Sequence, residues 1–241
     1  MTESKLFSHK FLSGSGLKLL AVLSMLVDHT AAVLLIRSDR MLLDFGRIHL
    51  SLYVAMRFFG RLAFPIFCFL LVEGFLHSHN RRRYAFRLLL FGLLSELPWN
   101  LAFGGRITFV YQNVYFTLLL GFLGLWLLER LEREQGDRTA NALGLLGLGL
   151  LSFPLRADYG ATGFGLILCM YLLRARPLPQ AVLSSCILTN GWKALPAFIP
   201  INFYNGKRGF VHSKLLQWAF YAFYPVHLTV LYLIRKHLYG F

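Results

Sequence analysis

Charged residues are scarce in this chain of 241 residues: they make up 15% of it, whereas hydrophobic residues make up 56%. A soluble domain of this length normally carries about 25% charged residues. So few charges argue against an ordinary soluble domain and indicate a polytopic membrane protein. The composition leaves no room for a separate soluble domain, so we expect residues 1–241 to form a single transmembrane domain.

Cysteine is also rare, and the three present, Cys68, Cys169 and Cys186, stand in apolar runs without CxxC spacing. We interpret them as small core hydrophobes, which argues against a disulfide framework or a cysteine metal site. Acidic residues number 11 against 25 Lys and Arg, a net charge of +14. The basic residues cluster in loops between apolar runs, as membrane topology requires. No basic face with interleaved stacking residues occurs, so we expect no nucleic-acid binding.

Long apolar runs dominate the chain and predict an all-α bundle of about eight transmembrane helices. The predicted spans are Gly16–Ile36, Phe58–Leu76, Tyr84–Phe103, Phe109–Leu128, Ala140–Phe153, Ala161–Leu173, Pro179–Ile199 and Leu215–Ile234. Polar residues and proline interrupt two of them: Ser95, Glu96 and Pro98 in the third, and Asn190, Gly191 and Pro196 in the seventh. Because two runs are short and one is broken, counts of seven and nine remain open.

The placement of Lys and Arg favours eight spans with both the N-terminus and the C-terminus in the cytoplasm. The triplet Arg81, Arg82 and Arg83 then lies inside. The predicted outer segments, which include Lys207 and Arg208, are more basic than the positive-inside rule prefers. We therefore expect the outer loops to meet an anionic ligand or the head groups of the bilayer.

The pair Asp28-His29 stands inside the first apolar run. An Asp at the centre of a membrane helix costs roughly 2.5–3.5 kcal/mol on insertion scales. Such groups usually face a polar cavity or take part in chemistry. We therefore treat the pair as the first candidate for a functional site.

Other polar side chains occur within or at the ends of the predicted spans. Glu73 and His77 are four residues apart and so share one helix face. The remaining candidates are Arg61, Arg83, Tyr84, Arg87, Glu96, Asn113, Asp158, Tyr159, Asn202, Tyr204 and Asn205. Each alone has a structural explanation, and His227 after Pro225 is expected to bond backbone carbonyls that the proline frees.

Seven of these groups map to the outer half of the membrane in the predicted topology. They are Asp28, His29, Arg61, Glu96, Asn113, Asp158 and Asn202. Their common level predicts a shared polar cavity. Histidine is the natural proton acceptor there, because its ordinary pKa lies near neutrality, and a neighbouring carboxylate can stabilise the imidazolium.

A metal site is the alternative for the two His–carboxylate pairs, since Asp28-His29 and Glu73 with His77 offer four ligands. The predicted topology puts the two pairs near opposite membrane faces, and neither has HExxH spacing. We therefore predict no metal.

Several short segments resemble the TraX family of integral membrane proteins. They run from Leu17 to His29, Gly60 to Phe67, Glu73 to His77, Tyr84 to Leu88, Ser95 to Pro98, Asn113 to Thr117 and Asp158 to Gly160. Their order is the expected one, and together they extend over nearly the whole chain.

This resemblance implies a location in the bacterial inner membrane and an activity. The named member of the family is associated with N-terminal acetylation of a conjugative pilin. The family is also similar to transmembrane acyltransferases of the acyltransferase-3 type, which move acetyl groups from cytoplasmic acetyl-CoA to acceptors beyond the membrane. That group uses a histidine on the non-cytoplasmic side, which corresponds here to His29 with Asp28 beside it. Arg61 and the Asp158 loop are further matches.

The expected reaction makes His29 the general base and Asp28 the support of its imidazolium. Arg61 or Asn113 then stabilises the oxyanion. We expect the phosphates of acetyl-CoA, the acyl donor, near Arg81, Arg82, Arg83 and Arg87, unless these arginines serve only as a topology anchor. The acceptor is a pilin N-terminus, a glycan or another envelope molecule, and the loop from Asn202 to Gly209 contacts it.

Two other functions remain open. A polar path from Glu73 and His77 to Asp28 and His29 fits a proton-coupled transporter. A non-enzymatic assembly factor for a pilus or an envelope polymer is the third hypothesis.

Overall fold

The computed structural model describes residues 10–35, 41–44, 49–108, 110–188 and 191–240. These residues form two compact units. The central unit comprises Cys68–Glu96 and Thr108–Leu195, and the terminal unit comprises Phe7–Phe67, Leu97–Ile107 and Pro196–Phe241. Two helices, α3 (Ala63–Leu76) and α4 (Arg81–Trp99), contain residues of both units.

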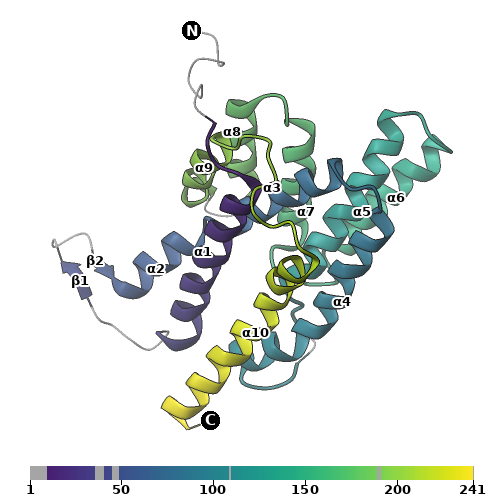
Figure 1. Ribbon diagram of the computed structural model, residues 1–241. Helices are drawn as coiled ribbons and strands as arrows, with labels where there is room; N and C mark the ends of the chain where they lie inside the picture. Colours follow the sequence, from purple (N-terminus) through teal and green to yellow (C-terminus); the bar gives the residue numbers. More distant parts are fainter. Residues whose placement is uncertain (1–9, 36–40, 45–48, 109, 189–190, 241) are drawn as a thin grey trace. The chain divides into compact units, whose positions relative to one another are not determined.

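The terminal unit is built around its first helix, and Figure 1 shows its elements along the chain. They are α1 (Gly14–Leu34), β1 (Met41–Asp44), β2 (His49–Ser51), α2 (Leu52–Gly60), the π-helical turn η2 (Asn100–Gly104), α9 (Phe198–Asn202) and α10 (Lys214–Tyr239). Helix α1 begins after Ser13, whose side chain accepts a hydrogen bond from the backbone N–H of Gly16 and so caps the helix. It packs against α2, α10 and η2.

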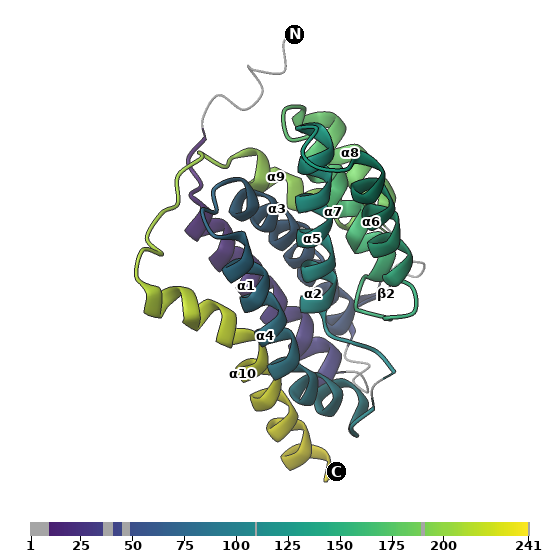
Figure 2. The same cartoon turned by 90° about the vertical axis from the view of Figure 1, so that its right-hand side faces the viewer.

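Helices α1 and α10 lie side by side and run in the same direction (Figures 1 and 2). Near the start of both helices, the N–H of Val211, three residues before α10, donates to the hydroxyl of Ser15 in α1 at 2.9 Å. At their far ends, the hydroxyl of Tyr239 donates to the carbonyl of Leu34 at 2.7 Å. An even number of spans between a cytoplasmic N-terminus and a cytoplasmic C-terminus requires the first and last spans to be antiparallel. The parallel pair therefore conflicts with that predicted topology.

A short antiparallel hairpin connects α1 to α2, which the all-α prediction lacks. Its strands pair Met41 with Ser51 and Asp44 with His49. Apart from this hairpin, the named elements are helical, so the predicted helical class is confirmed for the described residues.

The central unit is organised around α5 (Val114–Glu132). This helix contacts α6 (Arg138–Leu151) and α7 (Gly160–Leu172). Helix α8 (Pro177–Ile187) and the turn η3 (Gly191–Lys193) follow, and α8 packs on α7. Glycine allows α5 and α7 to approach closely, because a Cβ atom at Gly121 would lie 2.2 Å from the Ile167 side chain.

Among the described residues, four helical segments are long and apolar enough to cross a membrane: Gly14–Leu34, Leu52–Leu76, Arg81–Gly104 and Val114–Glu132. They match the first four predicted spans with corrected bounds. The second starts at Leu52 rather than Phe58. The third is not broken at Ser95–Pro98, because α4 continues through Pro98 and the π-helical turn η2 follows. The fourth begins at Val114 because Asn113 caps it. Ile36 and Phe109, two predicted span ends, lie outside the described residues.

The other four predicted spans differ more. Helices α6 and α7 have 14 and 13 residues, which is short for a span. The predicted span Pro179–Ile199 is divided into α8, η3, η4 (Leu195–Ala197) and α9, and Asn190 lies outside the described residues. Helix α10 has 26 residues, but its tyrosines, Gln217 and His227 make it less apolar. Eight spans therefore stay a prediction.

Candidate functional site

A pair of hydrogen-bonded histidines lies in the terminal unit, where α1 meets α10. His29 is 9% exposed and His227 is 5% exposed. The Nδ1 atom of His29 is 2.7 Å from the Nε2 atom of His227. Their rings are inclined by only 7°, with centroids 5.0 Å apart. The sequence predicted a role for His29 but paired it with its neighbour rather than with a residue 198 positions away.

The bond between His227 and its backbone partner shows which nitrogen donates in the hydrogen bond between the two histidines. The Nδ1 atom of His227 is 2.7 Å from the backbone carbonyl of Phe223, which can only accept, so this nitrogen carries the hydrogen. A neutral imidazole has one N–H, so the Nε2 atom of His227 is an acceptor. The Nδ1 atom of His29 therefore donates to it. In the neutral pair, the Nε2 atom of His29 is left without a proton and is basic.

Aromatic rings surround the two imidazoles. Phe103, on η2, meets the His29 ring edge-on with centroids 5.4 Å apart, and Tyr224 does so at 5.9 Å. Phe223 stacks on His227 at 4.8 Å. Such packing restricts the rotamers of both histidines and keeps their surroundings poor in water.

Asp28 takes a different partner from the one predicted. Its Oδ2 atom accepts a hydrogen bond from Arg57 on α2, and the two side chains form a largely buried ion pair. Among the described residues no hydrogen bond joins Asp28 to His29. The physical reason is helix geometry, because consecutive side chains point about 100° apart around the axis. The prediction that Asp28 supports the His29 imidazolium directly is therefore corrected: His227 contacts that ring.

Arg61 follows the last residue of α2 and lies within electrostatic range of Asp28. Within the described ranges, the ion pair of Asp28 is with Arg57, four residues earlier. The Oδ1 atom of Asp28 is buried and has no hydrogen-bond partner in the described part of the chain. It packs instead against the backbone of Gly60.

The predicted acceptor loop lies at the opposite end of α1. Asn202 ends α9, Tyr204 forms a bridge with Leu12, and the side chain of Asn205 donates to the carbonyl of Phe11 at 3.3 Å. Residues 11–15 precede His29 by 14 positions or more, which is about 20 Å along a helix. The prediction that Asn202 shares one membrane level with Asp28 and His29 is therefore wrong, because α10 runs parallel to α1 and starts beside it.

Three predicted residues of the central unit do come together. The backbone N–H of Asn113 donates to Glu96 at 2.9 Å, and its side-chain amide donates to Glu96 and to the carbonyl of Gly92 at 2.5 and 2.8 Å. Its amide oxygen accepts from the N–H of Tyr115, which caps α5. Asn113 is fully buried, and these bonds use both hydrogens of its amide, so it is not available as the predicted oxyanion donor.

The third residue, Asp158, lies beside this cap. Its N–H donates to the carbonyl of Gln112 at 2.9 Å, and its carbonyl accepts from the hydroxyl of Thr117. Tyr159 follows with a positive φ of 66° and precedes α7. The segment from Arg156 to Gly160 is thereby fixed against the start of α5 through its backbone.

The remaining predicted residues surround the start of α4 in the same unit. His77 donates to the carbonyl of Glu73 at 2.9 Å, which confirms that they share a helix face. The N–H of Arg83 donates to Asn80, which precedes the helix. Tyr84 packs against Gly74, and the guanidinium of Arg87 lies 5.5 Å from the centre of the Tyr84 ring.

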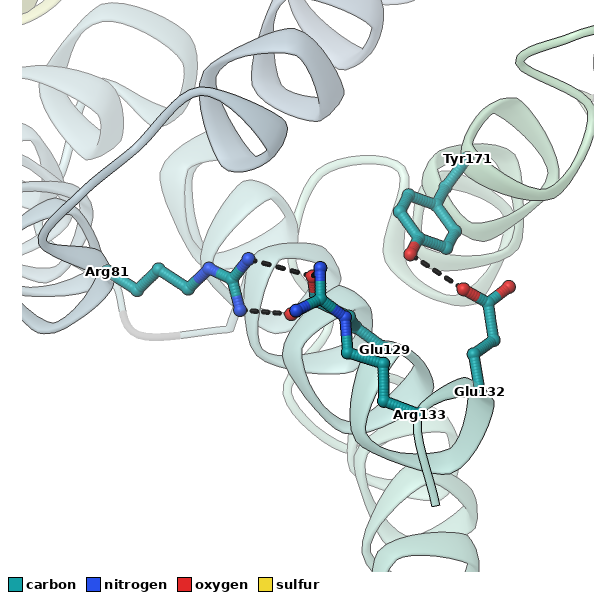
Figure 3. A network of polar contacts seen from close by, with 5 residues as sticks. All are labelled: Arg81, Glu129, Glu132, Arg133 and Tyr171. Atoms are coloured by element: carbon teal, nitrogen blue, oxygen red, sulfur yellow. Dashed lines mark hydrogen bonds and ion pairs between the residues drawn. The ribbon is translucent and has the colours of Figure 1, made fainter. Parts of the chain in front are cut away.

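A second polar cluster at the end of α5 was not predicted as a site (Figure 3). Glu129, which is 5% exposed, accepts two hydrogen bonds from Arg81 and pairs with Arg133. Glu132 accepts from the hydroxyl of Tyr171 at 2.8 Å. Arg81, which we expected to bind phosphate, is thus engaged by a carboxylate.

Arg57 and His227 are the two site residues that sequence reasoning missed. His227 was visible as a polar residue in an apolar run, and it does bond a backbone carbonyl, that of Phe223. Arg57 gave no comparable signal, because its partner Asp28 is 29 positions away. Within the described ranges, no group of three or more His, Cys, Asp or Glu side chains is arranged to hold a metal ion.

Comparisons with known proteins give the family. The model of the TraX protein family matches residues 13–235. The probable fimbrial assembly protein FimC, serogroup H1, of Dichelobacter nodosus is 34% identical over 253 aligned positions, which cover 91% of this chain and 94% of that protein. No solved structure matches the chain. With four helices able to cross a membrane and a family match over almost its whole length, the chain belongs to the TraX family of membrane proteins.

Proposed function

We propose that this protein is a membrane-embedded acetyltransferase of pilus or envelope assembly. It moves an acetyl group from cytoplasmic acetyl-CoA to an acceptor outside the inner membrane, with His29 as the general base. Membership of the TraX family supports a pilus-related role, as does the name of the fimbrial assembly relative. The reaction type comes from the similarity that we expect between this family and acyltransferase-3 enzymes.

The observation that carries the proposal is the bonding state of His29. Its Nδ1 atom is engaged by His227 at 2.7 Å, which leaves Nε2 as the nitrogen with a free lone pair in the neutral ring. Burying an imidazole inside a membrane-spanning helix costs free energy. Such a group is usually found there because it performs a function. The unprotonated Nε2 atom of a neutral imidazole can take a proton from an attacking amine or hydroxyl, which is the task of a general base.

The reaction proceeds by direct transfer. The acceptor amine or hydroxyl attacks the thioester carbonyl of acetyl-CoA as the Nε2 atom of His29 takes its proton. The new C–N or C–O bond forms, the C–S bond breaks, and the CoA thiolate leaves with the proton returned by the imidazolium. Arg61 is our candidate for stabilising the oxyanion, because Asn113 is saturated by structural bonds and Arg57 is paired with Asp28.

The donor is expected at the start of α4. Arg83 and Arg87 remain candidates for the CoA phosphates, with Glu73, His77 and Tyr84 beside them, whereas Arg81 is bound to Glu129. The acceptor is a pilin N-terminus, a glycan or another envelope molecule. Three further candidates belong to the central unit: Glu96, Asp158 and Tyr159. We propose that they affect substrate binding indirectly, by fixing the loops in which they take part.

Acetyl transfer by the purified protein in detergent tests the proposal. The assay supplies acetyl-CoA with a peptide or glycan acceptor, and mass spectrometry counts acetylated product. We expect His29→Ala to lower turnover about 100- to 10,000-fold, the range typical of a general base. His237→Ala is the matched control, since His237 is exposed in the last turn of α10. Near-normal turnover by His29→Ala would reject the assignment.

A non-enzymatic assembly role is the second candidate, because the Dichelobacter relative is named as a fimbrial assembly protein. Cells that carry the His29→Ala variant distinguish the enzyme from the non-enzymatic assembly factor. Loss of pilus assembly together with acetylation supports the enzyme, whereas normal assembly by an inactive variant supports the assembly factor. Proton-driven uptake into liposomes without acetyl-CoA would favour the transporter instead.

A further inference from the structure

We infer that His227 is a positioning residue for His29: it holds the base in the tautomer with hydrogen on Nδ1, so that Nε2 reacts. This inference rests on the proposed function of His29. It assigns a role to a residue of α10 that lies far from His29 in the sequence.

The first argument is the series of bonds. The carbonyl of Phe223 accepts from Nδ1 of His227, and Nε2 of His227 accepts from Nδ1 of His29, both at 2.7 Å. Phe223 is four residues before His227, so helix α10 itself orients the second imidazole. Because the carbonyl of Phe223 can only accept, it determines which ring nitrogen carries the hydrogen in each of the two neutral histidines.

The second argument is the kind of acceptor. A general base is commonly oriented by a carboxylate, but the carboxylate beside His29 in the sequence is paired with Arg57. A neutral imidazole takes that place here. When Nε2 of His29 accepts a proton, the hydrogen on its Nδ1 can move to Nε2 of His227. One added proton gives one positive charge, which the two hydrogen-bonded rings share.

The third argument is burial. His227 is 5% exposed, and its ring stacks on Phe223 with centroids 4.8 Å apart while one edge meets His29 through the hydrogen bond. Water therefore competes little for Nδ1 of His29. If His227 is replaced by a side chain that cannot accept a hydrogen bond, nothing holds the hydrogen of His29 on Nδ1.

Two matched substitutions test the role. In His227→Gln the amide oxygen lies close to the position of Nε2 and accepts from His29. In His227→Asn the shorter amide reaches only the position of Nδ1 and leaves His29 without its acceptor. We expect His227→Gln to keep turnover within about 10-fold of the unchanged protein, and His227→Asn to lose about 100-fold or more, as a base in the wrong tautomer does.

Nitrogen NMR gives a readout that does not depend on activity. With ¹⁵N-labelled histidine in nanodiscs, we expect His29 of the unchanged protein to show a protonated Nδ1 and an unprotonated Nε2. In His227→Asn we expect the hydrogen of His29 to move to Nε2. His29→Ala identifies its signals, and thermal unfolding of each variant verifies that it is folded.

The outcomes separate the two proposals. If His29→Ala abolishes transfer while His227→Asn keeps it, His29 is the base and His227 does not position it. A proton on Nε2 of His29 in the unchanged, neutral protein overturns the inference whatever the activities are. If His29→Ala transfers acetyl groups normally, the proposed function itself fails.

Discussion

Gly60 is the residue that lets α2 approach α1 at the level of Asp28. A Cβ atom at position 60 would lie 2.2 Å from both Cβ and Oδ1 of Asp28. Real Cβ atoms do not tolerate such contacts, and the ion pair with Arg57, on the same helix as Gly60, holds the Asp28 side chain in place. The glycine therefore permits the ion pair to form between the two helices.

We predict that Gly60→Ala destabilises the protein by about 1–3 kcal/mol, the usual cost of an overpacked site. Thermal unfolding in detergent measures the effect. Gly147→Ala in α6 is the matched control, since a Cβ there meets nothing within 4 Å and alanine favours the helix by roughly 0.5–1 kcal/mol. An unchanged unfolding midpoint for Gly60→Ala would contradict the close packing at Asp28.

Single residues of the site could be predicted only where their chemistry conflicts with their surroundings. Asp28, His29 and His227 are polar groups in apolar runs, so the sequence marks them as unusual. Their partners could not be predicted, because a hydrogen bond between residues 198 positions apart depends on how α1 and α10 pack. Asn113 is the opposite case. The sequence suggested it as an oxyanion donor, yet its hydrogen bonds are those of a helix cap.

Helix α5 is held to its neighbours at both ends by buried polar groups. Asn113 caps its start with bonds to Glu96, and Glu129 near its end pairs with Arg81 and Arg133. Because Glu129 is only 5% exposed, its charge requires these partners. The Arg81–Glu129 pair thereby fixes the start of α4 against the end of α5.

We predict that Glu129→Gln lowers the free energy of unfolding by about 3 kcal/mol, because it leaves the guanidinium of Arg81 without its anion. Glu132→Gln, three residues later, keeps an acceptor for Tyr171 and should cost less than about 1 kcal/mol. Titration of both variants with a denaturing detergent compares them. Equal losses would mean that charge at Glu129 contributes nothing beyond hydrogen bonding.

Helices were predictable where apolar length was decisive, as in the first four spans. The ends of these helices depend on local capping residues such as Ser13 and Asn113, which a hydropathy profile does not detect. The predicted seventh span failed because Gly191, Pro196 and neighbouring residues divide it into short pieces, although its composition is apolar.

The direction of α10 relative to α1 sets the topology of the terminal unit. At 1.5 Å per residue, the 21 residues of α1 and the 26 of α10 extend about 31 and 39 Å, enough for a hydrocarbon core of about 30 Å. If both cross the membrane, their starts share one face. Lys207 and Arg208 then lie on the side where α1 begins, whereas Arg235 and Lys236, near the end of α10, lie on the opposite side.

Cysteine labelling tests this topology. After Cys68, Cys169 and Cys186 are replaced by serine, single cysteines are introduced as Lys10→Cys, Lys207→Cys and Lys236→Cys, all at exposed positions. A maleimide that does not cross membranes is applied to intact and to lysed spheroplasts. We expect the first two cysteines to react from one face and the third from the other. Labelling of Lys236→Cys from the same face as Lys10→Cys would contradict the parallel arrangement.

The sequence by itself determined that this is a helical membrane protein of the TraX type, with costly polar groups at Asp28 and His29. Apolar length and burial cost suffice for that, because both are properties of single segments. Only the tertiary structure decided that Asp28 pairs with Arg57, that His29 bonds His227, and that α1 and α10 run in parallel. Each of these depends on side chains that packing brings together from distant parts of the chain.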